Sequence, residues 1–215
     1  SDKVASFLIH KDMEGVSIEE TWDSIAMRAT GSHDLVLNEV KVPKEMLIEY
    51  IIPGNKRAEG WLLHIPACYL GIAKAAFRYA VNFSLSYSPN SIERTKTISD
   101  LPNVRQKIGD MYLKIIQCEH FLYSVARKWD ESGYEERQKM KPELSAAKSS
   151  ITNAALEIVD LAMRLTGLYS LSQKNPLQRY YRDVRAGLHN PPMDDVTNML
   201  LADVAIAKMR QEKNP

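Results

Sequence analysis

The chain has 215 residues, of which 45% are hydrophobic and 26% charged, an ordinary balance for a globular protein. Its 28 basic and 27 acidic residues leave a net charge of +1, which gives no field to attract nucleic acid or an anionic membrane. No apolar run is long enough to span a membrane, and the chain opens without a signal peptide, so we expect a cytoplasmic protein. Cys68 and Cys118 fall among apolar helical residues and are expected to be buried thiols.

Residues 1–50 have the character of β-strands. The segments SFLIH, VSIEETW and LVLNEVKV are separated by turn signals at Gly15 and in ATGSH, and the last of them alternates apolar and polar residues. Three or four strands of this length predict one partial antiparallel sheet, with an apolar face that nothing else in the chain covers. We therefore expect residues 1–50 to be the C-terminal part of a larger β-domain whose beginning is missing.

Helical patterns follow a linker, IIPGNKRAEG at residues 51–60. Apolar residues then recur every three or four positions over 62–83, 104–129 and 144–165, with a shorter helix over 175–186 and a last one over 193–208. Short loops between helices with this spacing predict an up-and-down bundle of four to five helices at residues 61–215. The predicted fold class is α+β.

The segment from Asn175 to Pro192, NPLQRYYRDVRAGLHNPP, contains the signals of both helix ends. Asn175 can cap the helix and Pro176 can take its first position, while Gly187 and the two prolines end it. His189 lies at the end of this helix, where it either caps the last carbonyls or is held at a functional site. The residue pattern leaves both interpretations open.

Two long stretches carry a resemblance to a known family. Residues 162–185, AMRLTGLYSLSQKNPLQRYYRDVR, resemble the late helix, glycine turn and Arg-Asp helix of the acyl-CoA dehydrogenase superfamily. Residues 15–43, GVSIEETWDSIAMRATGSHDLVLNEVKVP, resemble the signature of its middle domain. The resemblance covers nearly the whole chain but corresponds to the back half of such an enzyme: the end of the middle β-domain and the C-terminal bundle.

The resemblance implies a flavin cofactor, FAD or alternatively FMN, between the middle sheet and the bundle of an oligomer, a dimer or tetramer. It places Arg28 and Ser32 near the cofactor, although hydroxyls that stabilise a turn would give the same pattern. Thr166 and Gly167 match the glycine turn, for which a plain helix C-cap is the alternative. Arg94 matches the arginine of a neighbouring subunit's cofactor site, or it is an exposed loop arginine.

The family reaction removes an α-proton from an acyl-CoA thioester with a glutamate while the flavin takes hydride from the β-carbon, and the electrons pass to a partner. Here His189 and Asn190 stand where that glutamate is expected, and the Asp-x-x-Arg pair for the substrate tail is absent. Asp194 and Asp195 are weaker candidates for the base, since acids in a first helical turn usually complement the helix dipole. We expect no metal site.

The sequence leaves three functions open. The first is acyl-CoA dehydrogenation in fatty acid metabolism. The second is a reduced-flavin monooxygenase on the same fold, in which a histidine after the Arg-Asp helix, here His189, assists oxygenation. The third is a non-catalytic oligomerisation module, which is how the truncated chain would behave.

Overall fold

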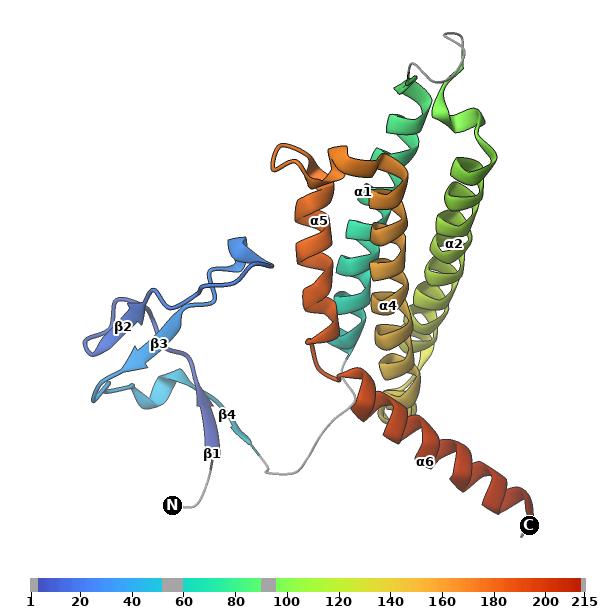
Figure 1. The fold of residues 1–215 in the computed structure, drawn as a ribbon. Helices are drawn as coiled ribbons and strands as arrows, with labels where there is room; N and C mark the ends of the chain where they lie inside the picture. Colours follow the sequence, from blue (N-terminus) through green and yellow to red (C-terminus); the bar gives the residue numbers. More distant parts are fainter. Residues whose placement is uncertain (1–3, 52–59, 90–95, 214–215) are drawn as a thin grey trace. The chain divides into compact units, whose positions relative to one another are not determined.

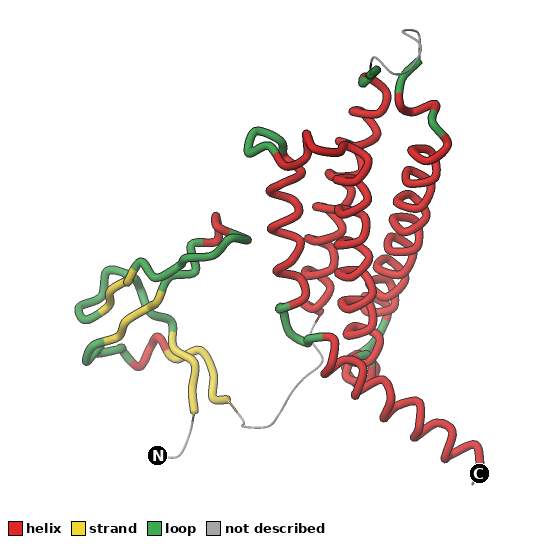
Figure 2. Tube along the Cα trace, viewed as in Figure 1, coloured by secondary structure: helices red, strands yellow, loops and turns green. Residues whose placement is uncertain are grey.

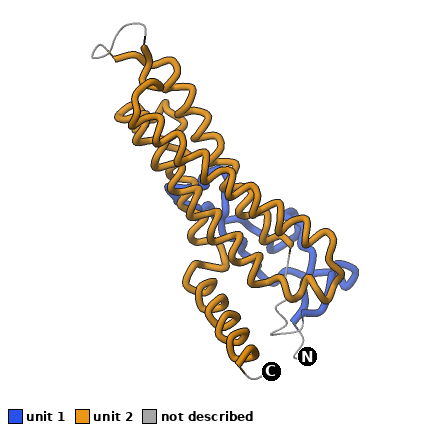
Figure 3. The backbone as a smooth tube through the Cα atoms, turned by 90° about the vertical axis from the view of Figure 1, so that its right-hand side faces the viewer, with its two compact units in different colours: residues 1–57 blue, residues 58–215 orange. Residues whose placement is uncertain are grey.

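The structure, a computed structural model, describes residues 4–51, 60–89 and 96–213. The chain divides into two compact units, Ser1–Arg57 and Ala58–Pro215 (Figure 3). Most of the expected linker at 51–60 lies outside the described residues: Ile51 ends the last strand and Gly60 begins a 3-10 turn, Gly60–Leu63.

The first unit contains four short strands: β1 (Val4–Phe7), β2 (Val16–Glu19), β3 (Asp34–Leu37) and β4 (Leu47–Ile51). β1 pairs with β4 and β2 pairs with β3, both antiparallel, so the strands form two two-stranded sheets and not the single expected sheet. The alternation after Leu37 does not continue as a strand because Glu39 takes a positive φ of 51° and turns the chain. Gly15 also has a positive φ, 82°, where it meets the backbone of Asn38.

The strands of this unit bury little apolar surface. Ala26 is buried, and no other residue between 4 and 51 is. Large apolar side chains stay exposed on both sheets and on the turns between them, among them Leu8, Ile18, Ile25, Leu35, Ile48 and Tyr50. The expected uncovered apolar face is therefore present, divided between two small sheets.

The second unit is helical: α1 (His64–Ser86), α2 (Pro102–Glu131), α3 (Tyr134–Lys139), α4 (Lys141–Thr166), α5 (Pro176–Arg185) and α6 (Asp194–Lys213). α1, α2, α4 and α5 lie side by side and alternate in direction, as Figures 1 and 2 show. This arrangement confirms the α+β class and the up-and-down bundle. The short helix α3 was not expected; it occupies the connection between α2 and α4.

Helix α4 forms the centre of the bundle, with fully buried apolar residues along its length from Leu144 to Ala162. Three of the fully buried residues of α1 are alanines, Ala73, Ala76 and Ala80, which allows close packing of the helices. Burying apolar side chains in this way is the main source of stability in such a bundle.

One cysteine of the helical unit differs from the expectation. Cys118 is buried as expected, but Cys68 is exposed because its position on α1 faces outward. In α6 the buried residue is Thr197, in its first turn, and the helix leads away from the bundle (Figure 1). Among the described residues, no helix combines the length and the apolar character needed to cross a membrane.

Candidate active site

Helix α5 begins as its sequence predicts. The Oδ1 atom of Asn175 accepts a hydrogen bond from the N–H of Leu177 at 2.9 Å, and Pro176 takes the first helical position. The side-chain amide of Asn175 also donates to the hydroxyl of Tyr79 on α1 at 2.9 Å. The cap therefore stabilises α5 and ties its start to a neighbouring helix.

At its other end, α5 continues into a 3-10 turn, Ala186–Leu188, and then into the connection to α6. The backbone N–H groups of His189 and Asn190 donate to the carbonyl of Ala186, at 3.0 and 3.2 Å. The helix end is thus capped by backbone groups, and within the described part of the chain the His189 imidazole takes no part in capping. His189 is exposed, which leaves its ring nitrogens accessible to a ligand.

Asn190 anchors this connection to α1. The hydroxyl of Tyr69, whose side chain is buried, donates to Oδ1 of Asn190 at 2.7 Å. Burial, and then the charges of Cys68 and Asp183, raise the pKa of Tyr69 to about 12, so the hydroxyl remains a donor at neutral pH. The connection can approach this closely because residue 187 is glycine: a Cβ there would lie 3.2 Å from Tyr69 and from Thr152.

Asp194 anchors the other end of the connection to α4. Its two carboxylate oxygens accept hydrogen bonds from Oγ of Ser149 at 2.7 Å and from Nδ2 of Asn153 at 2.8 Å. Burial alone would raise the pKa of this carboxyl, but the two hydrogen bonds and the charge of Lys148 outweigh it and hold the pKa below its usual value. Asp194 is therefore an ionised structural group and poorly suited to accept a substrate proton.

Asp195 also serves the start of α6. Its Oδ1 atom accepts from the N–H of Val196 at 2.8 Å, and the residue is exposed. Both acids thus act at a helix N-terminus, which is the alternative that the sequence left open for them. Of the three sequence-predicted catalytic residues, His189 keeps a side chain that is accessible and not engaged by the described chain.

The glycine turn lies between α4 and α5. Gly167 has φ 67° and ψ −148°, a conformation that is essentially restricted to glycine, and its N–H donates to the carbonyl of Met163. Thr166 is buried, and its hydroxyl donates to the carbonyl of Ala162 at 2.9 Å, so that side chain turns into the bundle. These two residues fit the helix C-cap interpretation, while the backbone of Gly167 remains open, since a Cβ there would meet no atom within 4 Å.

A surface hollow of about 660 Å³ adjoins this turn. Arg164 and Arg182 lie on its wall, paired with Asp160 and Gln178 respectively, beside exposed apolar residues such as Leu168 and Leu171. Guanidinium groups beside an open glycine backbone are the donors that a phosphate-bearing ligand requires. The hollow is of the size of known ligand pockets.

The middle-domain motif forms a turn in the first unit. Arg28 opens a 3-10 turn, Arg28–Thr30, the hydroxyl of Thr30 donates to the carbonyl of Met27 at 2.8 Å, and Ser32 donates to Thr30 at 3.1 Å. All three residues of the motif are exposed. The hydroxyls stabilise the turn and leave Arg28 projecting from it. Arg94, which was also expected near the cofactor, lies outside the described residues.

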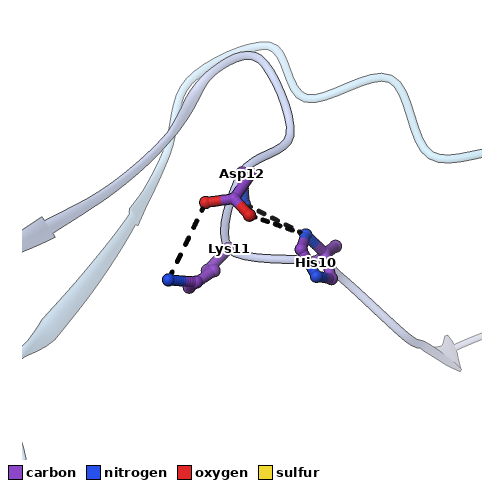
Figure 4. A network of polar contacts seen from close by, with 3 residues as sticks. All are labelled: His10, Lys11 and Asp12. Carbon is purple, nitrogen blue, oxygen red and sulfur yellow. Dashed lines mark hydrogen bonds and ion pairs between the residues drawn. The ribbon is translucent and has the colours of Figure 1, made fainter.

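Another polar group, His10, Lys11 and Asp12, lies on the turn after β1 (Figure 4). Nδ1 of His10 lies 3.4 Å from Oδ2 of Asp12, and Nζ of Lys11 lies 3.9 Å from Oδ1, with at least 67% of each side chain exposed. Contacts this exposed contribute little and define no site. Within residues 4–51, 60–89 and 96–213, no group of three or more His, Cys, Asp or Glu side chains could hold a metal ion.

Comparison with known proteins identifies the kind of bundle this is. Residues 60–188 match the profile described as "Acyl-CoA dehydrogenase, C-terminal domain". The match defines the helical unit as a domain of flavoprotein oxidoreductases, whose members bind FAD or FMN. The chain belongs to the acyl-CoA dehydrogenase family.

Three relatives illustrate the range of the family. The chain is 55% identical over 197 residues to "Putative acyl-CoA dehydrogenase YdbM" of Bacillus subtilis (strain 168). This alignment covers 91% of the chain and 51% of the relative. Butyryl-CoA dehydrogenase from Megasphaera elsdenii superposes with a TM-score of 0.78 at 21% identity, covering 95% of this chain and 52% of that one. Nitrososynthase from Micromonospora carbonacea var. africana superposes with a TM-score of 0.76 at 23% identity, covering 95% and 56%.

The two structural likenesses show the fold alone, and the chain spans about half the length of the curated relatives it matches. Sequence reasoning missed the hydrogen bond between Tyr69 and Asn190 and the α4 residues that hold Asp194. One signal was available for the first pair: Tyr69 lies on the apolar face of its helix, and a buried tyrosine hydroxyl needs a hydrogen-bond partner.

Proposed function

We propose that the protein is a flavin-dependent oxidoreductase that dehydrogenates the α,β carbon–carbon bond of an acyl-CoA thioester, as part of fatty acid metabolism. The observation that carries the proposal is the 55% identity, over 91% of the chain, to the relative named "Putative acyl-CoA dehydrogenase YdbM". The α5–α6 connection supports it, because it presents His189 from a segment anchored to α1 and α4.

His189 is the proposed proton acceptor. The reaction needs a base at the α-carbon of the thioester, and the carboxylates of Asp194 and Asp195 already serve the start of α6. A neutral imidazole can accept a proton near pH 7. The segment that carries His189 is held by backbone hydrogen bonds to the carbonyl of Ala186 and by the hydroxyl of Tyr69, which donates to Oδ1 of Asn190.

The cofactor proposed is FAD, with FMN as the alternative, and when bound it would take the hydride from the β-carbon. The open backbone of Gly167 and the arginines of the adjoining hollow suit its phosphate and ribityl groups. Arg28 and Ser32 of the middle-domain turn, and Arg94, are proposed as further contacts. Thr166 would contribute through its backbone, since its hydroxyl bonds to Ala162.

The domain assignment is also a proposal: residues 1–50 as the end of a middle β-domain, and residues 61–215 as the C-terminal bundle. The exposed apolar residues of β1–β4 support it, because a sheet face of this kind needs a cover. We propose a homo-oligomer, a dimer or tetramer, with an electron-transfer protein as a further partner.

A reduced-flavin monooxygenase is the second candidate. Its support is that His189 stands in the α5–α6 connection where the family resemblance leads us to expect a carboxylate. In that case His189 would donate or exchange a proton near the oxygenation site. A truncated chain without its flavin would behave as an oligomerisation module.

The deciding experiment mixes the complete, flavin-loaded protein anaerobically with a panel of acyl-CoA thioesters and follows the flavin absorbance. Rapid bleaching is expected, and His189→Gln should slow it by about 10²–10⁴-fold, the usual contribution of a general base. The control is Asp195→Asn, which alters a carboxylate in the same segment and should bleach as the wild type does. No bleaching by any thioester, with oxygen-dependent product formation from reduced flavin, would favour the monooxygenase.

A further inference from the structure

Helix α1 holds α5 at both of its ends, each time through a tyrosine and an asparagine. At the start of α5, Nδ2 of Asn175 donates to the hydroxyl of Tyr79 at 2.9 Å. Beyond its other end, the hydroxyl of Tyr69 donates to Oδ1 of Asn190 at 2.7 Å. The two contacts are therefore matched in chemistry, and they differ in the residues that lie beside them.

The contact made by Tyr69 reaches both sides of His189. The ring of Tyr69 lies against Gly187, because a Cβ on that glycine would lie 3.2 Å from two of the ring carbons. Its hydroxyl bonds to Asn190, the residue that follows His189. Tyr69 is only 3% exposed, and a side chain packed this closely in a core keeps one rotamer. One rigid side chain thus supports the backbone on each side of the imidazole.

The backbone between these two contacts leaves His189 little freedom. The N–H groups of His189 and Asn190 both donate to the carbonyl of Ala186, at 3.0 and 3.2 Å, and Pro191 and Pro192 restrict the chain that follows. The exposed imidazole has no hydrogen-bond partner within residues 4–51, 60–89 and 96–213, so this backbone determines where it lies. A displacement of Asn190 would move the peptide group that it shares with His189.

We propose that Tyr69 is a positioning residue for His189: its ring and its hydroxyl together fix the place from which the imidazole reaches the substrate. This role rests on the proposed use of His189 in the reaction. Tyr69 touches neither substrate nor cofactor, since its side chain is buried in the bundle. Tyr79 has no such role, because its partner Asn175 caps the opposite end of α5.

The test compares Tyr69→Phe with Tyr79→Phe in the complete, flavin-loaded protein. Each change removes one hydroxyl and one hydrogen bond to an asparagine and keeps the ring, so the Tm should fall by about 2–4 °C in both. In Tyr69→Phe the kcat for thioester dehydrogenation should also fall by about ten- to a hundredfold, with KM within about twofold, because a small misplacement of a reacting group lowers the rate.

Tyr79→Phe is the matched control, and its kcat should stay within about twofold of the wild-type value. A kcat that falls equally in the two variants would overturn the proposal, since the loss would then follow from any weakening of the contact between α1 and α5.

A second comparison shows whether the loss passes through His189. In a His189→Gln protein the proposed base is already gone, so adding Tyr69→Phe should lower the remaining kcat by no more than about twofold. Asn190→Leu removes the acceptor of the same hydrogen bond and should slow the reaction as Tyr69→Phe does, with no further loss in the double variant. Losses of Tyr69→Phe and His189→Gln that multiply would mean that Tyr69 does not act through His189.

Crystal structures of the variants give a readout that does not require turnover. The backbone of residues 188–190 should move by about 1 Å in Tyr69→Phe and keep its place in Tyr79→Phe, a displacement large enough to account for the expected loss of rate. Such a movement in a protein that oxidises no thioester would refute the proposed reaction and keep the role of Tyr69 in placing His189. An unmoved segment in Tyr69→Phe, or an unchanged kcat where the wild type turns over a thioester, would overturn the positioning role.

Discussion

The two units of the chain are held in their conformations by different means. The helical unit buries apolar side chains along α1, α2, α4 and α5, whereas Ala26 is the buried residue of the described strand unit. Among the described residues, five have a positive φ: Gly15, Met27, Gly31 and Glu39 lie in the strand unit, and Gly167 lies in the helical unit. The bundle is specified by side-chain packing, and the strand unit by backbone conformation at its turns.

This difference bears on what each unit can do alone. A bundle with its own core can keep a connection such as 186–193 in place. Two two-stranded sheets with exposed apolar residues are marginal without further cover. The proposed catalytic segment therefore lies in the part of the chain with its own core, and the middle-domain turn with Arg28 lies in the part that needs support.

The largest expected effect tests the core directly. Ile151→Ala removes a fully buried side chain of α4 and should destabilise the 215-residue chain by about 2–5 kcal/mol in urea unfolding followed by far-UV circular dichroism. The matched change Leu35→Ala, at a residue of β3 that is 58% exposed, should alter the same transition by about 0.5 kcal/mol at most. Equal losses at the two positions would show that the contrast between the units is wrong.

The backbone of the strand unit provides the next test. In Gly15→Ala the new Cβ would lie 2.1 Å from the carbonyl oxygen of Asn38, at a φ of 82°, so strain of about 1–3 kcal/mol should break the β2–β3 pairing. Hydrogen exchange of the amides in Val16–Glu19 should accelerate while those of α4 keep their protection. Gly109→Ala is the control: it lies in α2 with open space around it and should stabilise the chain by about 0.5–1 kcal/mol. Protection of β2 that survives Gly15→Ala would contradict the expectation.

Where the sequence succeeded, the signal was local. Asn175 and Pro176 define the start of α5, because a capping atom and a missing N–H act within one turn. The apolar spacing predicted the bundle for the same reason, since it depends on helix geometry alone. The single sheet was wrong because strand pairing depends on distant segments: β1 pairs with β4 from across the whole unit.

The candidate site was predictable only in part. The end of α5 followed from Gly187 and the two prolines, but Tyr69 and Asn190 stand 121 positions apart and no local pattern joins them. The burial of Lys148 escaped notice because one lysine within an apolar helix usually extends its charged end to solvent. Whether it does so depends on the helix packed against it, which periodicity within α4 does not reveal.

The smallest effect concerns the contact between α4 and α6, where the bundle relies on polar groups. The pKa of Asp194 lies below its usual value of 3.8, so its contribution to stability is complete above about pH 4 and is lost as the pH falls through the folded-state pKa. The difference between wild type and Asp194→Asn, of about 1 kcal/mol near neutral pH, should thus shrink as the pH falls below about 4. Asp195→Asn, which keeps Asp194, should retain the acid-dependent loss. A constant difference down to pH 2 would mean that Asp194 is not held as an anion by α4, and that this contact resembles the apolar remainder of the bundle.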